Sequence, residues 1–228
     1  VHPPIGKWVI GAGIQIFGDN PFGWRVAVAL LGTLSILLIA KIAARIFGAL
    51  GYGLIAALLA FFDGLNLVMS RTALLDMTLT TFLLIAAWFL IDRRYLLAGV
   101  FFGLALGTKW NAIFYIIAFS LYFVTREIRE IVSKQSASEV QQFHRKDFLS
   151  LIALRKAQLF LVPLVIYTAS WIGWFLSPRG WSRFWSADNG GSFLAPFRSF
   201  IHYQFEILNF HKGLDSGHNY RSSAWQWI

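Results

Sequence analysis

The sequence predicts an all-α integral membrane protein with about six transmembrane helices. Hydrophobic residues make up 57% of the 228 residues and charged residues only 14%, whereas an average soluble chain has roughly 45–50% and 25%. The mean hydropathy is +0.60, and the apolar residues are gathered in long runs. A soluble domain of this length has too small an interior for so many apolar side chains, so we expect the chain to lie in a bilayer.

Residues 1–25 are expected to form a loop on the outer face of the membrane. They lack a basic segment followed by a clean apolar run, so they do not form a signal peptide. Because the chain begins with Val1 rather than Met, we interpret it as part of a longer protein.

Four apolar runs are long enough to cross a bilayer as single helices. The hydrocarbon core takes about 20 helical residues. The runs predict spans at residues 26–47, 50–68, 73–91 and 158–176.

A fifth apolar run, residues 95–125, is longer and is interrupted by Gly107-Thr108-Lys109-Trp110-Asn111. As one helix its roughly 29 apolar residues would extend about 43 Å, too long for the core without a steep tilt. The loop 126–156 holds seven Lys and Arg residues, and Asp92-Arg93-Arg94 is a second basic turn. Basic loops stay cytoplasmic, and both lie inside only if the run crosses twice. We therefore predict spans at 95–108 and 111–125, with Lys109 at the outer turn between them.

This topology divides the chain into a membrane core, residues 1–176, and an outer-face segment, residues 177–228. Four tryptophans lie where the last span meets the outer surface, as in an interfacial aromatic belt: Trp171, Trp174, Trp181 and Trp185. Apolar residues recur near helical spacing in 197–214, which predicts a helix in the interface plane. The net charge of +9 needs no nucleic-acid partner, because topology accounts for the densest basic loop.

Ionisable residues from four outer segments are expected at one membrane depth. They are His2, Lys7, Arg25, Arg71, Asp76 and Lys109. Ionisable groups in such places favour a functional interpretation, and Arg and Lys suit a phosphate at the headgroup level. The alternative is that each cation snorkels to the interface without further function. We expect Asp76 to pair with Arg71, one helical turn away.

Other chemistries find little support in the sequence. With no cysteine, there is no disulfide or thiolate site. His202, His211 and His218 are spaced by nine and seven residues without a tight acidic motif, which argues against zinc. We therefore expect no metal or cofactor, and assign His202 and His211 to polar contacts on the acceptor side or to packing. Gly99, Gly103 and Gly107 form a small-residue stripe for close helix packing.

Five motifs follow one another in order along the chain. They are His2-Pro3-Pro4-Ile5-Gly6-Lys7-Trp8, Asn20-Pro21-Phe22-Gly23-Trp24-Arg25, Ser70-Arg71-Thr72-Ala73-Leu74-Leu75-Asp76, the segment from Gly103 to Asn111, and His202-Tyr203 with Ile207-Leu208-Asn209-Phe210-His211. Together they resemble the protein O-mannosyltransferases, in particular the actinobacterial enzymes that use polyprenyl-phosphate mannose.

The resemblance implies a partial GT-C glycosyltransferase fold in the plasma membrane, with its active site on the extracytoplasmic face. It implies inverting transfer of mannose from polyprenyl (dolichyl) phosphate mannose to Ser and Thr hydroxyls of exported proteins. Donor-binding roles carry over to His2, Lys7, Arg25, Arg71, Asp76 and Lys109. The catalytic base of the family belongs to an Asp-Glu pair that would precede Val1, so no catalytic residue is assigned in this chain, and residues 1–228 alone are expected to be inactive.

Two other functions remain as alternatives. One is a GT-C transferase with a lipid acceptor, such as an aminoarabinose transferase. The other is a transporter or channel, although transporters often have discontinuous helices at matching positions in two halves, and the sequence predicts a single break, at Lys109.

Overall fold

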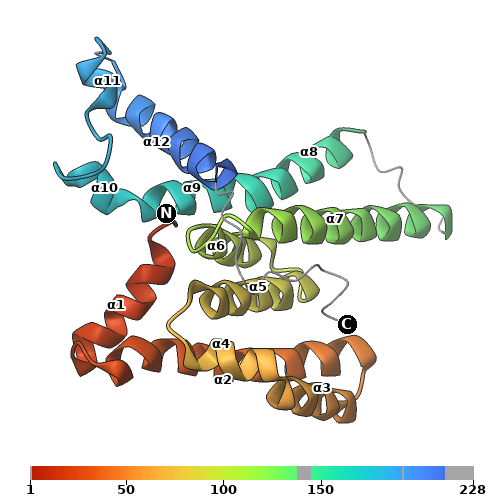
Figure 1. Ribbon diagram of the computed structural model, residues 1–228. Helices are drawn as coiled ribbons and strands as arrows, with labels where there is room; N and C mark the ends of the chain where they lie inside the picture. Colours follow the sequence, from red (N-terminus) through yellow and green to blue (C-terminus); the bar gives the residue numbers. More distant parts are fainter. Residues whose placement is uncertain (1, 138–144, 192, 214–228) are drawn as a thin grey trace. The chain divides into compact units, whose positions relative to one another are not determined.

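The computed structural model describes residues 2–137, 145–191 and 193–213, and all the regular structure in these ranges is helical (Figure 1). The chain divides into two compact units, His2–Trp171 and the segment that begins at Ile172. Each unit is described by itself.

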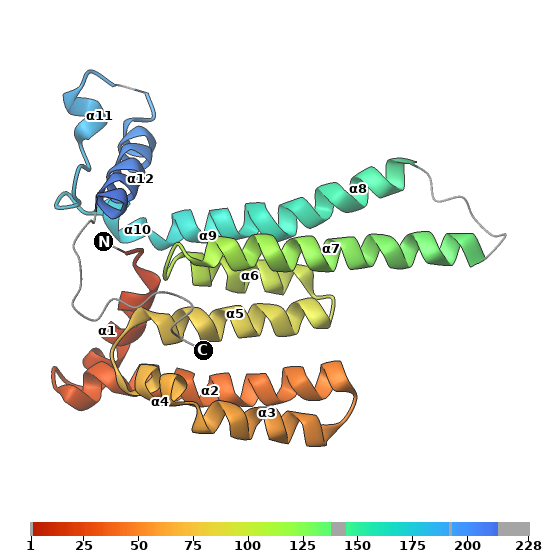
Figure 2. The same ribbon diagram turned by 45° about the vertical axis from the view of Figure 1, so that its right-hand side comes forward.

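The first unit holds nine α-helices and one π-helix among its described residues. They are α1 (Ile5–Phe17), α2 (Pro21–Phe47), α3 (Leu50–Phe62), α4 (Gly64–Arg71), α5 (Leu75–Ile91), α6 (Tyr95–Leu106), α7 (Ala112–Ala137), α8 (Arg145–Lys156), the π-helix (Ala157–Leu161) and α9 (Val162–Ser170). Helix α5 packs between α2 and α6, and α6 packs in turn against α9 (Figure 2).

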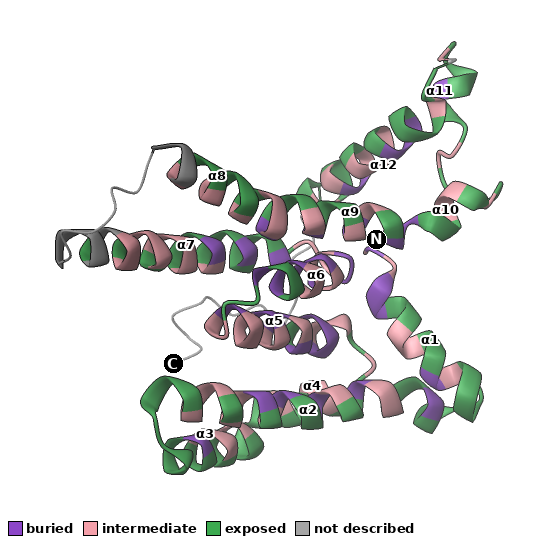
Figure 3. Cartoon of the chain, turned by 180° about the vertical axis from the view of Figure 1, so that it is seen from behind, coloured by how far each residue is buried: buried purple, intermediate pink, exposed green. Residues whose placement is uncertain are grey.

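The apolar core of this unit lies around α5 and α6. Phe102, Leu90, Ile116 and Leu159 are among its fully buried side chains. Helix α3 lies at the margin, where Gly53 is its one buried residue; Figure 3 shows its mostly exposed surface. Such an exposed apolar surface is what a lipid-facing helix presents.

The glycine stripe of α6 serves the packing that the sequence predicts. A Cβ atom at Gly99 would overlap the carbonyl oxygen of Gln158, and one at Gly103 would lie 2.6 Å from Cβ of Ile166. A Cβ atom at Gly107 would lie 2.5 Å from Cδ1 of Ile5. The small residues therefore let α6 approach both the π-helix–α9 segment and the start of α1.

The sequence led us to expect a loop over the first 25 residues, but the structure shows that most of them are helical. They contain α1 and the first turn of α2, which begins at Pro21 rather than at residue 26. The Asn20 side chain accepts hydrogen bonds from the backbone N–H groups of Phe22 and Gly23, each 3.0 Å. Asn at the N-cap followed by Pro is a strong helix start, and this local signal explains why α2 begins at Pro21.

The predicted span 50–68 is broken at Asp63. Helices α3 and α4 meet there at 64°, and Oδ2 of Asp63 accepts a hydrogen bond from the backbone N–H of Asn66 at 2.6 Å. Asp favours N-caps because its carboxylate competes with the helical backbone bonds. The run is thus two helices, either a broken span or a re-entrant loop.

The interrupted run 95–125 reverses direction at Gly107–Asn111. Helix α6 ends before this turn and α7 begins after it, and the Arg93 guanidinium, before α6, pairs with Glu130 of α7. Helices α6 and α7 therefore form a hairpin. That both arms cross a membrane remains a prediction.

By length and composition, two helical segments in the described part of the chain could cross a membrane, or three if α3 and α4 are one bent span. They are Pro21–Phe47 and Phe148–Ser170. The second begins at Phe148 rather than at residue 158, because α8, the π-helix and α9 run on without a break. It ends before Trp171 rather than at residue 176, since a turn at Trp171 separates α9 from α10.

The second unit contains three helices in its described residues: α10 (Ile172–Leu176), α11 (Trp185–Asp188) and α12 (Ala195–Lys212). Helix α12 agrees with the helix predicted within 197–214. Ser199, Phe200 and Ile207 are its buried residues, whereas Phe197, Ile201 and Phe205 are each more than half exposed. An interfacial position for this exposed stripe remains a prediction.

Candidate functional site

Three of the sequence motifs meet at the turn between α6 and α7. The backbone N–H of Ile5, at the start of α1, donates to the carbonyl oxygen of Gly107 at 2.9 Å. A Cβ atom at Gly6 would lie 2.8 Å from Cδ2 of Leu75 and 2.9 Å from Cγ2 of Thr108. Gly6 is therefore in close contact with both the start of α5 and the turn. Lys7, Asp76 and Lys109 each follow one of these contacting residues.

Asp76 pairs with Lys109. The Lys109 ammonium nitrogen lies 2.7 Å from Oδ1 of Asp76, and the two side chains are 23% and 37% exposed. The pair joins the first turn of α5 to the hairpin turn. Opposite charges at this distance and partial burial stabilise each other more than they would in water.

The expected pair of Arg71 with Asp76 is wrong. Arg71 ends α4, and Thr72 has an extended backbone (φ −110°, ψ 135°), so the two residues do not share a helix. The rule for residues four or five apart presumes one continuous helix. The rule does not apply here, and Asp76 pairs instead with Lys109, 33 residues away.

Three candidate cations are exposed and form no ion pair within the described residues: Lys7, Arg25 and Arg71. Arg71 follows Ser70, which lies against Gly32 of α2. Arg25 lies on α2 near Gly23, where Gly13 of α1 packs. At 1.5 Å per residue, Gly13 is about 12 Å along α1 from Ile5. The structure thus brings Asp76, Lys109 and the start of α1, which carries Lys7, to one place, whereas Arg25 on α2 lies near the other end of α1.

His2 is half-buried and precedes Pro3, which is fully buried. Since Ile5 is bonded to Gly107, His2 belongs to the segment that leads to the turn.

A cavity of about 490 Å³ extends from Asp76 between α2, α3, α4 and α5. Its polar lining residues are Ser35, Asp63, Asn66, Asp76 and Thr80. Sequence reasoning missed all of these except Asp76. The signal was present in Asp63-Gly64, since Asp followed by Gly marks a turn even inside an apolar run.

His202 and His211 belong to the second unit. His202 Nε2 lies 3.2 Å from Oε1 of Glu206, and its ring stacks on Trp185 with centroids 3.8 Å apart. Oε2 of Glu206 also accepts hydrogen bonds from Trp181 Nε1 (3.1 Å) and Ser182 Oγ (2.9 Å). Glu206 therefore fixes the His202 ring and joins the segment before α11 to α12.

Tyr203 and His211 are two further residues of this unit with defined neighbours. Burial and the nearby Glu206 raise the pKa of Tyr203 above its usual value. The His211 ring lies edge-on to Phe210 at 5.6 Å. His218 lies outside the described residues. In the described ranges, no group of three or more His, Asp and Glu residues could hold a metal ion.

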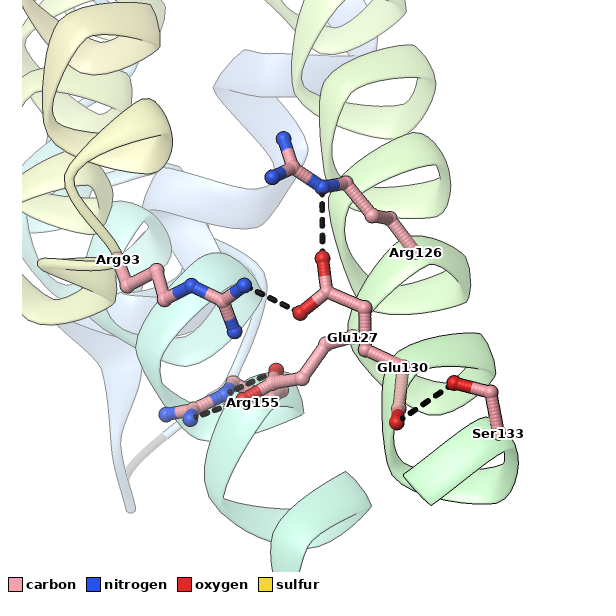
Figure 4. Close-up of polar contacts among 6 residues, drawn as sticks. All are labelled: Arg93, Arg126, Glu127, Glu130, Ser133 and Arg155. Carbon is pink, nitrogen blue, oxygen red and sulfur yellow. Dashed lines mark hydrogen bonds and ion pairs between the residues drawn. The ribbon is translucent and has the colours of Figure 1, made fainter. Parts of the chain in front are cut away.

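A second charged cluster lies at the other end of the hairpin (Figure 4). The Arg155 guanidinium donates two hydrogen bonds to Glu127, at 2.7 and 2.8 Å, and the two side chains are 15% and 11% exposed. Arg155 also donates to Gln158 at 2.8 Å and lies 3.9 Å from the centroid of the Tyr95 ring. These contacts occupy both the N–H edge and the flat face of the Arg155 guanidinium group.

Glu130 lies next to this pair and accepts hydrogen bonds from Arg93 and Arg126. These bonds hold the pKa of Glu130 below its usual value. For Glu127, burial alone would raise the pKa, but the bonds from Arg155 outweigh it and the pKa is lowered. We name Arg93, Arg126, Glu127, Glu130 and Arg155 the arginine cluster. Sequence reasoning treated its arginines only as topology signals.

Comparison with known proteins matches the chain to the same family that its motifs resemble. A family model described as dolichyl-phosphate-mannose-protein mannosyltransferase matches residues 1–139. The whole chain is similar to the polyprenol-phosphate-mannose–protein mannosyltransferases of Corynebacterium glutamicum (31% identical, 51% of that protein) and Mycobacterium tuberculosis (30% identical, 50% of that protein). A stretch covering 47% of the chain is 36% identical to 21% of an undecaprenyl phosphate-alpha-4-amino-4-deoxy-L-arabinose arabinosyl transferase of Pseudomonas fluorescens.

The chain spans about half the length of the two mannosyltransferases that it matches from end to end. The family match itself covers more than half of the chain and includes the turn, the Lys109–Asp76 pair and Lys7. On this evidence, the chain belongs to the dolichyl-phosphate-mannose-protein mannosyltransferase family.

Proposed function

We propose that the chain forms the donor-binding part of an inverting mannosyltransferase at the extracytoplasmic face of the plasma membrane. The donor is polyprenyl-phosphate mannose, and the acceptors are Ser and Thr hydroxyls of exported proteins. Membership of the family, which implies a GT-C membrane fold, supports the class of reaction. The observation that supports the proposal for this chain is the Lys109–Asp76 pair at a turn that also contacts the start of α1, the segment that carries Lys7.

The chemistry requires positive charge beside the donor phosphate. The acceptor oxygen attacks the sugar C1 from the face opposite the phosphate, the C1–O bond to the phosphate breaks, and the phosphate leaves with the electron pair. Cationic groups that face the growing phosphate charge lower the barrier. Lys7, Arg25 and Arg71 are exposed cations without ion pairs among the described residues, and Asp76 holds Lys109 in place.

The hydroxyl proton must go to a base. Asp76 is poorly suited, because its carboxylate already accepts a hydrogen bond from the Lys109 ammonium group. We assign the base to the Asp-Glu pair of the family, outside these 228 residues. His202 and His211 are assigned to the acceptor side.

A product assay tests the proposed reaction. Membranes that contain the protein expressed in full from its gene are supplied with polyprenyl-phosphate [³H]mannose and a Ser/Thr-rich peptide. We expect labelled glycopeptide from the protein and none from membranes without it. Label that is found only in lipid would overturn the assignment of a protein acceptor.

A lipid acceptor is the second candidate, because part of the chain matches an aminoarabinose transferase. The same assay, run with undecaprenyl-phosphate aminoarabinose and a lipid acceptor, separates the two functions by their products. Transfer of aminoarabinose without transfer of mannose would favour this candidate.

Cysteine labelling tests the six-span topology on which the outer site depends. Residues 1–228 contain no cysteine, so once any cysteine elsewhere in the full-length protein is replaced by serine, one introduced cysteine gives an unambiguous signal. In intact cells we expect a membrane-impermeant maleimide to label cysteine at Arg71 and at the exposed Asn111, which follows Lys109 in the turn. Cysteine at the exposed Arg129 should react only after permeabilisation. Labelling of 71 and 111 from opposite sides would exclude a shared site.

A further inference from the structure

The turn that carries Lys109 has an anchor that the mechanism above does not use. The indole Nε1 of Trp110 donates a hydrogen bond to the Tyr167 hydroxyl at 2.9 Å. Tyr167 lies on α9, is 7% exposed, and its ring lies edge-on to Trp171 at 6.3 Å. The bond therefore joins the residue next to Lys109 to a buried side chain of another helix.

Helix α9 is held firmly against α6 and can act as a fixed support. Gly103 of α6 leaves room for Ile166 and for the backbone of Pro163, and Pro163 is fully buried. Close-packed helices transmit a change in position rather than absorb it. The distance from α9 to the turn is thus set by packing on one side and by the Trp110–Tyr167 bond on the other.

Three elements anchor the turn. Helix α1 contributes the Ile5–Gly107 backbone bond, α5 contributes the Asp76 carboxylate, and α9 contributes Tyr167. The bond from α1 holds the backbone that precedes Lys109, and the carboxylate from α5 holds the Lys109 ammonium group. Tyr167 acts on the residue that follows Lys109, so the three together hold the turn from both sides of this lysine.

We propose that Tyr167 is a positioning residue for Lys109 and acts through Trp110. This inference rests on the proposed mannosyl transfer, in which Lys109 faces the donor phosphate. A displacement of a fraction of an ångström in a charged group weakens stabilisation of the leaving phosphate, because that stabilisation depends on preorganised geometry.

The variant Tyr167→Phe removes the hydroxyl and leaves the ring contact with Trp171. We expect kcat of the full-length protein to fall about fivefold, the size expected for one neutral hydrogen bond. The KM for the lipid donor should change less than about twofold, as for an interaction realised mainly in the transition state. Tyr122→Phe is the matched control, because Tyr122 is 62% exposed on α7, and it should keep wild-type kcat.

A double-mutant cycle separates positioning from a loss of folded protein. In the background of Lys109→Met, Tyr167→Phe should cause no further loss of kcat/KM, because the residue it positions is gone. Trp110→His keeps an N–H donor in the turn and should retain more activity than Trp110→Phe.

Two results would overturn the inference while the proposed function stands. One is an active wild-type protein in which Tyr167→Phe behaves like Tyr122→Phe. The other is a fivefold loss that recurs in the Lys109→Met background, since that loss would reflect stability alone. A wild-type protein that makes no glycopeptide would instead contradict the proposed function itself.

Discussion

The two ends of the α6–α7 hairpin both carry ion pairs, but they differ in how completely the charges are satisfied. In the arginine cluster, Arg155 and Glu127 share two hydrogen bonds, and their side chains are 15% and 11% exposed. Arg155 also contacts Gln158 and Tyr95. At the turn, Lys109 and Asp76 share one contact and are 23% and 37% exposed. A saturated pair serves the fold, whereas an open pair beside a cavity has capacity left for a ligand.

If this comparison is right, the arginine cluster should dominate stability. Arg155→Met leaves the Glu127 carboxylate buried without its partner, and we expect the free energy of unfolding to fall by about 3–5 kcal/mol. Thermal unfolding of the purified protein in detergent measures this. Arg129→Met, at an exposed position on the same α7 helix as Glu127, should have little effect.

The paired variant sharpens the same test. Arg155→Met together with Glu127→Leu removes both charges, and stability should recover most of the loss. If Arg155→Met alone unfolds at the wild-type temperature, the cluster is not the structural end of the hairpin.

The turn should show the opposite behaviour. Lys109→Met removes a cation from the candidate donor site, and we expect kcat/KM for mannosyl transfer to fall about 100-fold, about 2.7 kcal/mol. Unfolding temperature should change little, because a partly exposed pair contributes about 1 kcal/mol or less. Lys41→Met, at an exposed position of α2, serves as the control. A large loss of stability with normal activity would reverse the comparison.

The smallest effect is expected at Glu130, on the exposed side of the arginine cluster. Hydrogen bonds from Arg93 and Arg126 lower its folded pKa below the ordinary 4.5. Its contribution to stability is therefore present above pH 4.5 and is lost as pH falls through the folded pKa. Glu130→Gln should show a weaker decline in unfolding temperature below pH 4.5 than the wild type. Equal declines would mean that the bonds contribute nothing measurable.

Local patterns predicted much of the fold. The apolar runs indicated α2 and α5, the glycine stripe indicated that α6 packs closely against a neighbouring helix, and the interruption at Lys109 indicated the reversal between α6 and α7. These features depend on residues close together in sequence. The motifs also identified Asp76 and Lys109, which the structure pairs, and Lys7, which follows the Gly6 that contacts the same turn.

The partners within the site could not be predicted in this way. Asp76 was assigned to Arg71 because they are close in sequence, but residues 72–74, extended at Thr72 and Leu74, separate their helices, and Asp76 pairs with Lys109 instead. The Arg155–Glu127 pair depends on how α7 and α8 are aligned, which no local spacing encodes. The break at Asp63 did have a local signal, the Asp-Gly pair, which the length of the apolar run obscured.

The π-helix between α8 and α9 sets the rotation of one helix about its axis relative to the other. A π turn holds about one residue more than an α turn, and one residue corresponds to about 100° in an α-helix. Removing one residue from Ala157–Leu161 would therefore rotate Arg155 about a quarter turn away from Glu127 while Pro163 kept its contact with Gly103. The wide turn thus lets a single continuous helix present its proline to one neighbour and its arginine to another.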